Sequence, residues 1–535
     1  MSDVVRVAIP RMPTLPVPAQ RPPWLVALLA VLAALRELVR YLREKNQVLR
    51  DEIARLKHLK AKPVIRPSKL IERERTKRRT RRTPGDKAPH PVDHTVVVKA
   101  AQVPPGSTFK GYADYTVREL VIHAETTLYR VEKWQTPAGT IVQGEMPVPL
   151  PDTGPGAHFG PTLRCFVLYQ YYHAQVTEPL LVEQLREWGV RVSAGELHAL
   201  ITDGKDAFHR EKDAILRVGL RVSPHIQVDD TGARHQGKNG VTTHIGNTWF
   251  AWFQTTGSKS RINFLELLRA GHTDYVVSGE ALEYMAAQHL PAIPLAKLAT
   301  ATDRVFLDRA AWQAALAGWG ITTARDVRIA TEGALIGAVL AHGIHPHLAI
   351  VSDDAGQFNV LLHALCWIHA ERLLAQLIGF NADQRDALAK VRTTVWQFYR
   401  DLQAYRAAPT EAAKVDLSAR FDALCATRTC FASLNQALKR MGRNKRELLL
   451  VLERTDLPLH NNLSEGDIRE YVKRRKISGG TRSEAGRKGR DTFASLKKTC
   501  RKLGVSFWAF LNDRIRGANA IPALPSLIEA RAQSP

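Results

Sequence analysis

The 535-residue sequence has few cysteines and no long apolar segment. Its five cysteines are scattered, and no two of them form a C-x-x-C pair. A disulfide framework and a zinc finger or ribbon are therefore excluded, because both need clustered cysteines. The longest apolar run, 24–35, has 12 residues. A membrane span needs roughly 18 or more. We therefore expect a reduced, cytoplasmic protein without a membrane partner.

Acidic residues are scarce relative to basic ones. The chain has 76 Lys and Arg against 52 Asp and Glu, a net charge of +24. Two segments, 57–87 and 469–502, each hold 13 basic and three acidic residues, so most of the excess lies in them. Such blocks favour a nucleic-acid partner over a merely solvated face. The length and the 45% hydrophobic content predict about three or four folded domains.

Apolar residues repeat every seven positions near the N-terminus. The repeat comprises Leu28, Leu35, Leu42, Leu49 and Leu56, and a second series four positions further on comprises Leu32, Val39, Asn46 and Ile53. This a/d pattern predicts a leucine-zipper-like coiled coil over 24–60, and the single polar residue at an a position favours a parallel homodimer. A monomeric amphipathic helix is the alternative.

Three further segments precede the acidic motifs. Residues 61–91 form a basic linker or arm, and 92–150 alternate loosely and predict a small β-rich module. The residues of the arm that we expect to contact DNA are Lys77, Arg78, Arg79, Arg81 and Arg82. Over 161–205, a helix capped by Thr177, a break at Gly189 and an S-x-x-E capping box at Ser193 predict a helix-turn-helix. An ordinary helical hairpin would have the same pattern.

Carboxylates follow two strand-like segments. Asp229-Asp230 comes after 225–228, and Asp353-Asp354 comes after 347–352. Later in the chain, Asn461, Glu465 and Arg469 share one helix face by their i, i+4, i+8 spacing. Two strand-end aspartates and a helix-borne glutamate suit a two-metal phosphoryl-transfer site, since Mg²⁺ prefers carboxylate oxygens. The alternative is that the aspartates only cap loops.

Four motifs together resemble DDE transposases of the insertion-sequence-66 family. Asp229-Asp230-Thr231 resembles the family's D-E-T, and Asp353 with Phe358 resembles its D-G-x-x-x-Y. Residues 366–372 resemble its C-x-x-H-x-x-R, and 461–465 its N-N-x-x-E. Three features depart from the family: the cysteine-bearing zinc segment is missing, Gly466 replaces an Arg, and Asp354 replaces a Gly. These departures put a zinc-dependent DNA contact in doubt and leave the three acidic positions in place.

The resemblance implies a multidomain α/β protein. Its RNase H-like α/β catalytic core would comprise 220–370 and 455–515, with a helical insertion at 371–454. Asp229, Asp353 and Glu465 would be the catalytic and metal-binding triad, holding two Mg²⁺ or Mn²⁺ ions. Asp230 and Asp354 are second choices that would support the metal shell.

The implied activity is cleavage of transposon ends followed by strand transfer. Double-stranded DNA, both transposon ends and target, would be the partner, and the resemblance leaves room for accessory transposition proteins. The location would be cytoplasmic and nucleoid-associated. A non-catalytic DNA-binding or regulatory protein on the same scaffold, and an RNase H-like nuclease without strand transfer, are the alternatives.

Two groups of residues near the triad receive separate predictions. The second basic block is expected to contact DNA through Arg469, Lys473, Arg474, Arg475 and Lys476. Arg469 lies one helical turn past Glu465, so pairing with that carboxylate is an equal alternative. Cys366 and His369 supply only two ligands on an apolar helix, and a packing role is favoured over a metal pair.

Overall fold

A computed structural model describes residues 22–58, 92–146 and 158–533 of the chain, which divides into two compact units, Met1–Ile122 and His123–Pro535. In the first unit, α1 (Pro23–His58) is an uninterrupted helix of 36 residues. Leu28, Leu35, Leu42 and Leu49 are all exposed along it. The predicted helix is thus present, and its apolar stripe is uncovered within the described residues. The coiled-coil dimer stays a prediction.

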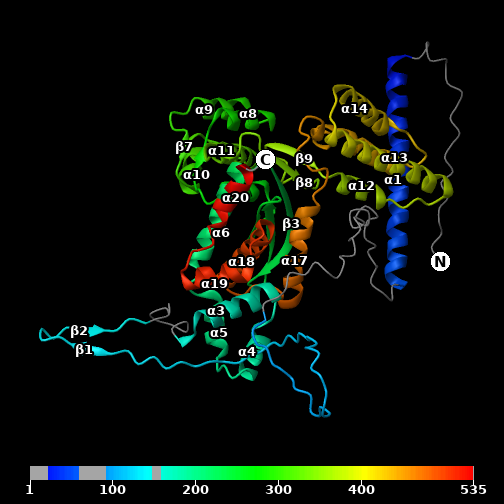
Figure 1. Cartoon of the computed structure of the whole chain (residues 1–535). Coiled ribbons are helices and arrows are strands. Elements are labelled where there is room, and N and C mark those ends of the chain that lie inside the picture. The colour runs from blue at the N-terminus through cyan, green and yellow to red at the C-terminus, as the bar shows by residue number, and fades with distance from the viewer. Residues whose placement is uncertain (1–21, 59–91, 147–157, 534–535) are drawn as a thin grey trace. The chain divides into compact units, whose positions relative to one another are not determined.

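A five-stranded mixed sheet forms the centre of the second unit (Figure 1). Its strands are β3 (His225–His235), β4 (Lys238–Gly246), β5 (Ala251–Thr256), β8 (Ala349–Ser352) and β9 (Leu362–Leu365). The spatial order is β5-β4-β3-β8-β9. The first three strands are antiparallel, whereas β8 runs parallel to both β3 and β9. β4 and β5 form an antiparallel hairpin that turns after Gly246.

Both faces of the sheet are covered. Ile226, Val228 and Ile350 point into one core, which they share with α6 (Asp206–Val222), whereas Ala349 and Val351 point into a second core on the other face. Alternate residues of a strand point to opposite faces, so one strand supplies both cores. Helix α17 (Asn462–Ser478) covers the second face beside β3, opposite α6 (Figure 1).

Helix α18 (Glu484–Leu503) closes the free edge of the sheet at β5. Three of its side chains, four residues apart and hence on one helix face, accept hydrogen bonds from three alternate backbone N–H groups of β5. Thr499 Oγ1 accepts from Ala251 (3.2 Å), Ser495 Oγ from Phe253 (2.9 Å) and an Asp491 carboxylate oxygen from Thr255 (2.8 Å). An edge strand otherwise presents unpaired donors, and here a helix satisfies them.

Helices precede and follow this core. Before it lie α3 (Pro161–Leu168), continued by the π-helical turn η3 (Tyr169–Ala174), then α4 (Glu178–Glu187) and α5 (Ala194–Thr202). After it, α19 (Phe507–Arg516) and α20 (Leu524–Gln533) pack on the same core as α6. The capping box of Ser193 and Glu196 is confirmed. Thr177 occupies the N-cap position of α4 without a side-chain hydrogen bond.

Long helical segments interrupt the core in two places. The predicted one, between β9 and α17, comprises α12 (Trp367–Ala375), α13 (Ala382–Ala407), α14 (Glu411–Ala426), α15 (Ala432–Arg443), α16 (Lys445–Leu448) and η4 (Leu450–Leu452). A second helical segment lies between β5 and β8. It was not predicted from the sequence, because 220–370 was assigned to the core as a whole. It comprises α7 (Arg261–Leu268), α8 (Gly279–Ala287), α9 (Ala292–Ala299), α10 (Arg309–Gly318) and α11 (Ala324–Ala341), with the short strands β6 (Tyr275–Val276) and β7 (Val305–Phe306).

The segment predicted as a small β-rich module has little regular structure. Between residues 92 and 146, the strands are β1 (Lys133–Gln135) and β2 (Ile141–Gln143), which form one exposed hairpin. Its turn lies at Pro137–Gly139, where the sequence predicted it. Three residues per strand without a covering layer bury almost no apolar surface, so nothing extends the pairing further.

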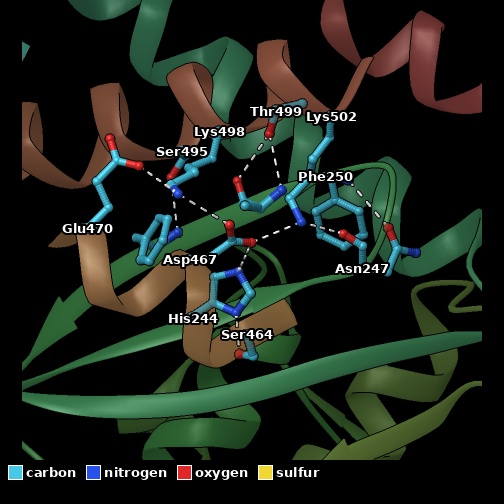
Figure 2. A network of polar contacts seen from close by, with 12 residues as sticks. His244, Asn247, Phe250, Ser464, Asp467, Glu470, Ser495, Lys498, Thr499 and Lys502 are labelled. Carbon is cyan, nitrogen blue, oxygen red and sulfur yellow. Dashed lines mark hydrogen bonds and ion pairs between the residues drawn. The ribbon is translucent and has the colours of Figure 1, made fainter. Parts of the chain in front are cut away.

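A buried polar network holds α17 and α18 to β4 (Figure 2). Asp467 of α17 lies 3.2 Å from Nε2 of the buried His244, and its carboxylate also meets the ammonium groups of Lys502 (2.9 Å) and Lys498 (3.4 Å). Burial alone would raise the pKa of Asp467, but His244 and the lysines outweigh burial and hold it well below its usual range. Lys498 continues the network to Glu470, one turn along α17.

We predict that Asp467→Asn destabilises the protein by about 3 kcal/mol at pH 7, because it leaves the buried Lys502 without its carboxylate partner and Lys498 with Glu470 alone. The exposed pair Asp422–Lys445 offers a control, where Asp422→Asn should cost less than about 1 kcal/mol. The folded pKa of Asp467 is depressed, so its contribution is present above the unfolded pKa. The difference from the parent should therefore narrow below about pH 4. Urea unfolding at several pH values measures it, and equal costs for both variants would contradict the role of the network.

We also predict that α1 makes the protein a dimer. Replacing Leu35 and Leu42 with Lys places charge on the apolar stripe and should yield a monomer in sedimentation, as should excising residues 24–60. Replacing Arg36 and Arg43 with Gln, one position further along the same helix, should leave the dimer intact. A dimer that survives the leucine changes would exclude the zipper.

Candidate active site

Asp229 lies within β3, just past the point where the pairing of β3 with the parallel strand β8 stops. The expectation that the first strand ends at Asp229-Asp230 is wrong, because β3 continues to His235 in its pairing with β4. The pairing of β3 with β8 ends at Gln227 opposite Val351. Continuing the same register by two residues sets Asp229 level with Asp353, which directly follows β8. The two predicted aspartates are thus neighbours at one sheet edge, where α/β proteins commonly bind ligands.

The first turn of α17 brings Glu465 to the same edge. Asn461, which precedes the helix, is fully buried, and its Nδ2 donates to the backbone oxygen of Val228 (2.7 Å), the residue before Asp229. Ser464 Oγ lies 2.6 Å from Nδ1 of His244 on β4. These two contacts fix the helix start on β3 and β4, and Glu465 follows at once.

The three carboxylates act on one another electrostatically. The pKa of Asp229 is raised to about 7, first by burial and then by the negative charges of Asp353, Asp230 and Glu465. A hydrogen bond from the Asp230 amide opposes the shift only in part. Burial and the neighbouring charges therefore favour the protonated form of Asp229, and a nearby positive charge would favour loss of the proton.

The second-choice aspartates have cationic partners. Asp230 lies 2.9 Å from Lys259 Nζ and accepts a hydrogen bond from Gln357 (2.7 Å). Asp354 is exposed and accepts from Arg440 Nε (2.9 Å) on α15 of the helical insertion. Both carboxylates are therefore paired with a neighbouring cation, whereas burial and the nearby carboxylates dominate the pKa of Asp229.

Glu465 is held by Arg372 of α12. The guanidinium forms a two-pronged pair, with Nη1 to Oε1 at 3.0 Å and Nη2 to Oε2 at 3.2 Å. His369 Nε2 lies 3.6 Å from Oε1, and Arg469 Nη2 lies 3.5 Å from Oε2. Sequence reasoning gave Arg372 no role, although its spacing of three from His369 places both on one helix face.

Cys366 has a packing role, as the sequence favoured. Its buried Sγ accepts the backbone N–H of Asn461 (3.2 Å), and the Trp367 N–H donates to the Leu459 oxygen (2.9 Å). Burial raises the pKa of Cys366 to about 11, so it stays a thiol at neutral pH. The C-x-x-H-x-x-R segment thus fastens the loop before α17 with its first residue and meets Glu465 with its last two.

The predicted DNA-contacting residues lie in different environments. Lys77, Arg78, Arg79, Arg81 and Arg82 lie outside the described residues. Lys473 and Lys476 are exposed on α17. Arg475 donates to Thr231 Oγ1 (3.3 Å), beside the first aspartate pair. Arg474 is buried, with its guanidinium 4.1 Å from the centre of the Tyr171 ring, and it joins α17 to η3.

One cluster of three potential ligands in the described part of the chain has all its ligand atoms within 4.8 Å of one another: His272, Asp274 and His342. The two imidazole rings stack face to face, 3.5 Å apart, and His342 Nε2 pairs with Asp274 (2.7 Å). Stacked rings direct their lone pairs in parallel rather than toward a common ion. Asp229, Asp353 and Glu465 are more widely spread than this cluster, with Glu465 drawn to Arg372.

The chain resembles known proteins. A model of the "Transposase IS66 family" matches residues 349–489, from β8 into α18. A relative from Sinorhizobium fredii (strain NBRC 101917 / NGR234), the uncharacterized protein y4jO, is 44% identical over 321 residues, which is 59% of this chain and 100% of that protein. Among the described residues, no helix combines the length and apolar character needed to cross a membrane. The chain belongs to the IS66 family of transposases.

Proposed function

We propose that this chain is a DNA transposase that cleaves transposon ends and transfers strands, with Asp229, Asp353 and Glu465 as its catalytic carboxylates. The observation that carries the proposal is the placement of Asp229 level with Asp353 on adjacent strands, with the start of the helix that bears Glu465 fastened to the residue before Asp229. Structural carboxylates are normally paired with cations, and clustered acidic groups with a perturbed pKa are typical of functional sites.

The donor set fits divalent metal ions. Three carboxylates from β3, the end of β8 and α17 offer hard oxygen ligands, the type preferred by Mg²⁺ and Mn²⁺. Two such ions, when bound, would activate the attacking oxygen and stabilise the leaving oxygen of a phosphodiester.

The chain's own residues would hold the catalytic carboxylates in position and balance the charge around them. Asp229 would lose its proton as the site fills, and Asn461 and His244 would keep the start of α17 in place. Asp230 and Asp354, which are paired with Lys259 and Arg440, would shape the edge of the site rather than act in it.

An RNase H-like core is the architecture that we propose for this site. The strand order β5-β4-β3-β8-β9, with three antiparallel strands followed by parallel ones, supports it. The helical insertion enters between the second aspartate and the glutamate, where the sequence resemblance expected it.

DNA contacts would come from several parts of the chain. The two helices α4 and α5, with their capping box, support the predicted helix-turn-helix. The exposed lysines of α17 and the arm at 61–91 would bind backbone phosphates. A dimer formed through α1 would hold two such sets of contacts together.

We predict that Asp229→Asn, Asp353→Asn and Glu465→Gln each abolish cleavage of a duplex carrying the transposon end. The substitutions keep side-chain shape but remove the charge that holds a divalent ion, so DNA binding by gel shift should stay near the parent value. Asp354→Asn is the matched control and should retain most activity. Unchanged cleavage in all three variants would exclude the proposed chemistry, and products without strand joining would indicate a nuclease.

We further predict that Asp229→Asn stabilises the metal-free protein. The folded pKa of Asp229, about 7, lies above its unfolded value, so ionising this group costs stability as pH rises. The gain should appear above about pH 4, grow up to about pH 7 and reach roughly 4 kcal/mol. Thermal unfolding in a chelator measures it, with Asp354→Asn as the control that should change little. If Asp229→Asn were less stable to unfolding than the parent at pH 8, ionised Asp229 would not be destabilising beside the other carboxylates, and the prediction would be wrong.

A further inference from the structure

Exposed cations surround the acidic site and are paired with its carboxylates. Lys259 meets Asp230, Arg440 meets Asp354, and both Arg372 and Arg469 meet Glu465. These four cations come from four different parts of the chain. Lys259 lies just before α7, and Arg440 lies on α15. Arg372 lies on α12, and Arg469 lies on α17. Their side chains are between 43% and 68% exposed, so a ligand can reach them.

Arg372 makes the most specific of these pairs. Its two-pronged contact engages both oxygens of Glu465, whereas Arg469 approaches one oxygen at 3.5 Å. A planar guanidinium binds a phosphate with the same two-pronged geometry that it uses for a carboxylate. The Glu465 carboxylate therefore occupies the position on the Arg372 guanidinium that a phosphate could take.

The same pair opposes metal binding. A positive charge in contact with Glu465 repels a divalent cation that would use this carboxylate, and the site is shielded enough for the repulsion to count. Glu465 is largely buried, with 13% of its side chain exposed. The three carboxylates are also not gathered as one ligand cluster while Arg372 holds the third.

We propose that Arg372 is a phosphate-binding residue of the active site, held by Glu465 until DNA arrives, and that its transfer to a DNA phosphate frees Glu465 for the metal. This inference rests on the proposed function. The exchange couples the two ligands: DNA raises metal affinity, and metal raises DNA affinity by the same factor. In this scheme Arg372 contacts the DNA phosphate directly and affects the metal only through Glu465.

The test is titration of Mn²⁺ into the full-length protein by calorimetry, with and without a short DNA duplex. In the parent, the duplex should tighten Mn²⁺ binding about tenfold. Arg372→Gln should bind Mn²⁺ about tenfold more tightly without DNA, since the competing charge is gone. The duplex should then add little. Arg372→Lys keeps the positive charge but cannot make the two-pronged guanidinium contact. Its Mn²⁺ affinity without DNA should therefore fall between those of the parent and Arg372→Gln.

Arg420→Gln is the matched control. Arg420 also pairs with two carboxylate oxygens, on Asp401 and Asp416, and is 44% exposed against 43% for Arg372, but it lies on α14 away from the site. Arg420→Gln should bind Mn²⁺ with the affinity of the parent, both with and without the duplex. Circular dichroism verifies folding, and if Arg372→Gln unfolds, Arg372→Lys decides the matter by the same two titrations.

Two results separate this inference from the proposed function. Unchanged or weaker Mn²⁺ binding in Arg372→Gln, or full retention of the DNA effect, would show that Arg372 merely supports Glu465 and would overturn the exchange. Unchanged Mn²⁺ binding in Asp229→Asn and Glu465→Gln would instead remove the metal site itself, and both proposals would fall with it.

Discussion

The candidate site depends on how the first turn of α17 is fastened to the sheet. Glu465 reaches the aspartates because Asn461 bonds to the backbone of β3 immediately before Asp229, and because Ser464 meets His244 on β4. Asp467 then joins the same histidine to two lysines of α18. A helix positioned only by apolar packing can slide or rotate, whereas these directional contacts fix its register against the strands.

The helical insertion contributes to the site as well as interrupting the core. Its first helix, α12, supplies Cys366 to the loop before α17 and Arg372 to Glu465. A later helix, α15, supplies Arg440 to Asp354. The insertion thus places cations beside carboxylates that belong to the sheet, and the site is assembled from parts of the chain more than two hundred residues apart.

The closure of the sheet edge ties the C-terminal helices to this arrangement. Asp491, Ser495 and Thr499 satisfy the outward donors of β5, so α18 is held along the strand. Lys498, which meets Asp467 and Glu470, lies between Ser495 and Thr499, and Lys502, which meets Asp467, lies three residues past Thr499. Many of the basic residues in 469–502 therefore serve a network inside the fold, and the charge excess of this segment is partly internal. Arg474, buried against Tyr171, is a further case.

Local sequence patterns determined the elements of this protein. The heptad leucines predicted the helix α1, the S-x-x-E box predicted the start of α5, and Asp353 marked the end of β8, whereas β3 continues past Asp229 to His235. These features depend on residues within a few positions of one another, so the sequence carries them directly. Tertiary structure alone decided the partners of those residues: the pairing of Glu465 with Arg372, the burial of Arg474, and the second helical segment between β5 and β8. Each of these depends on groups that are distant in the chain and become neighbours only when the sheet forms, and no local periodicity records such a meeting.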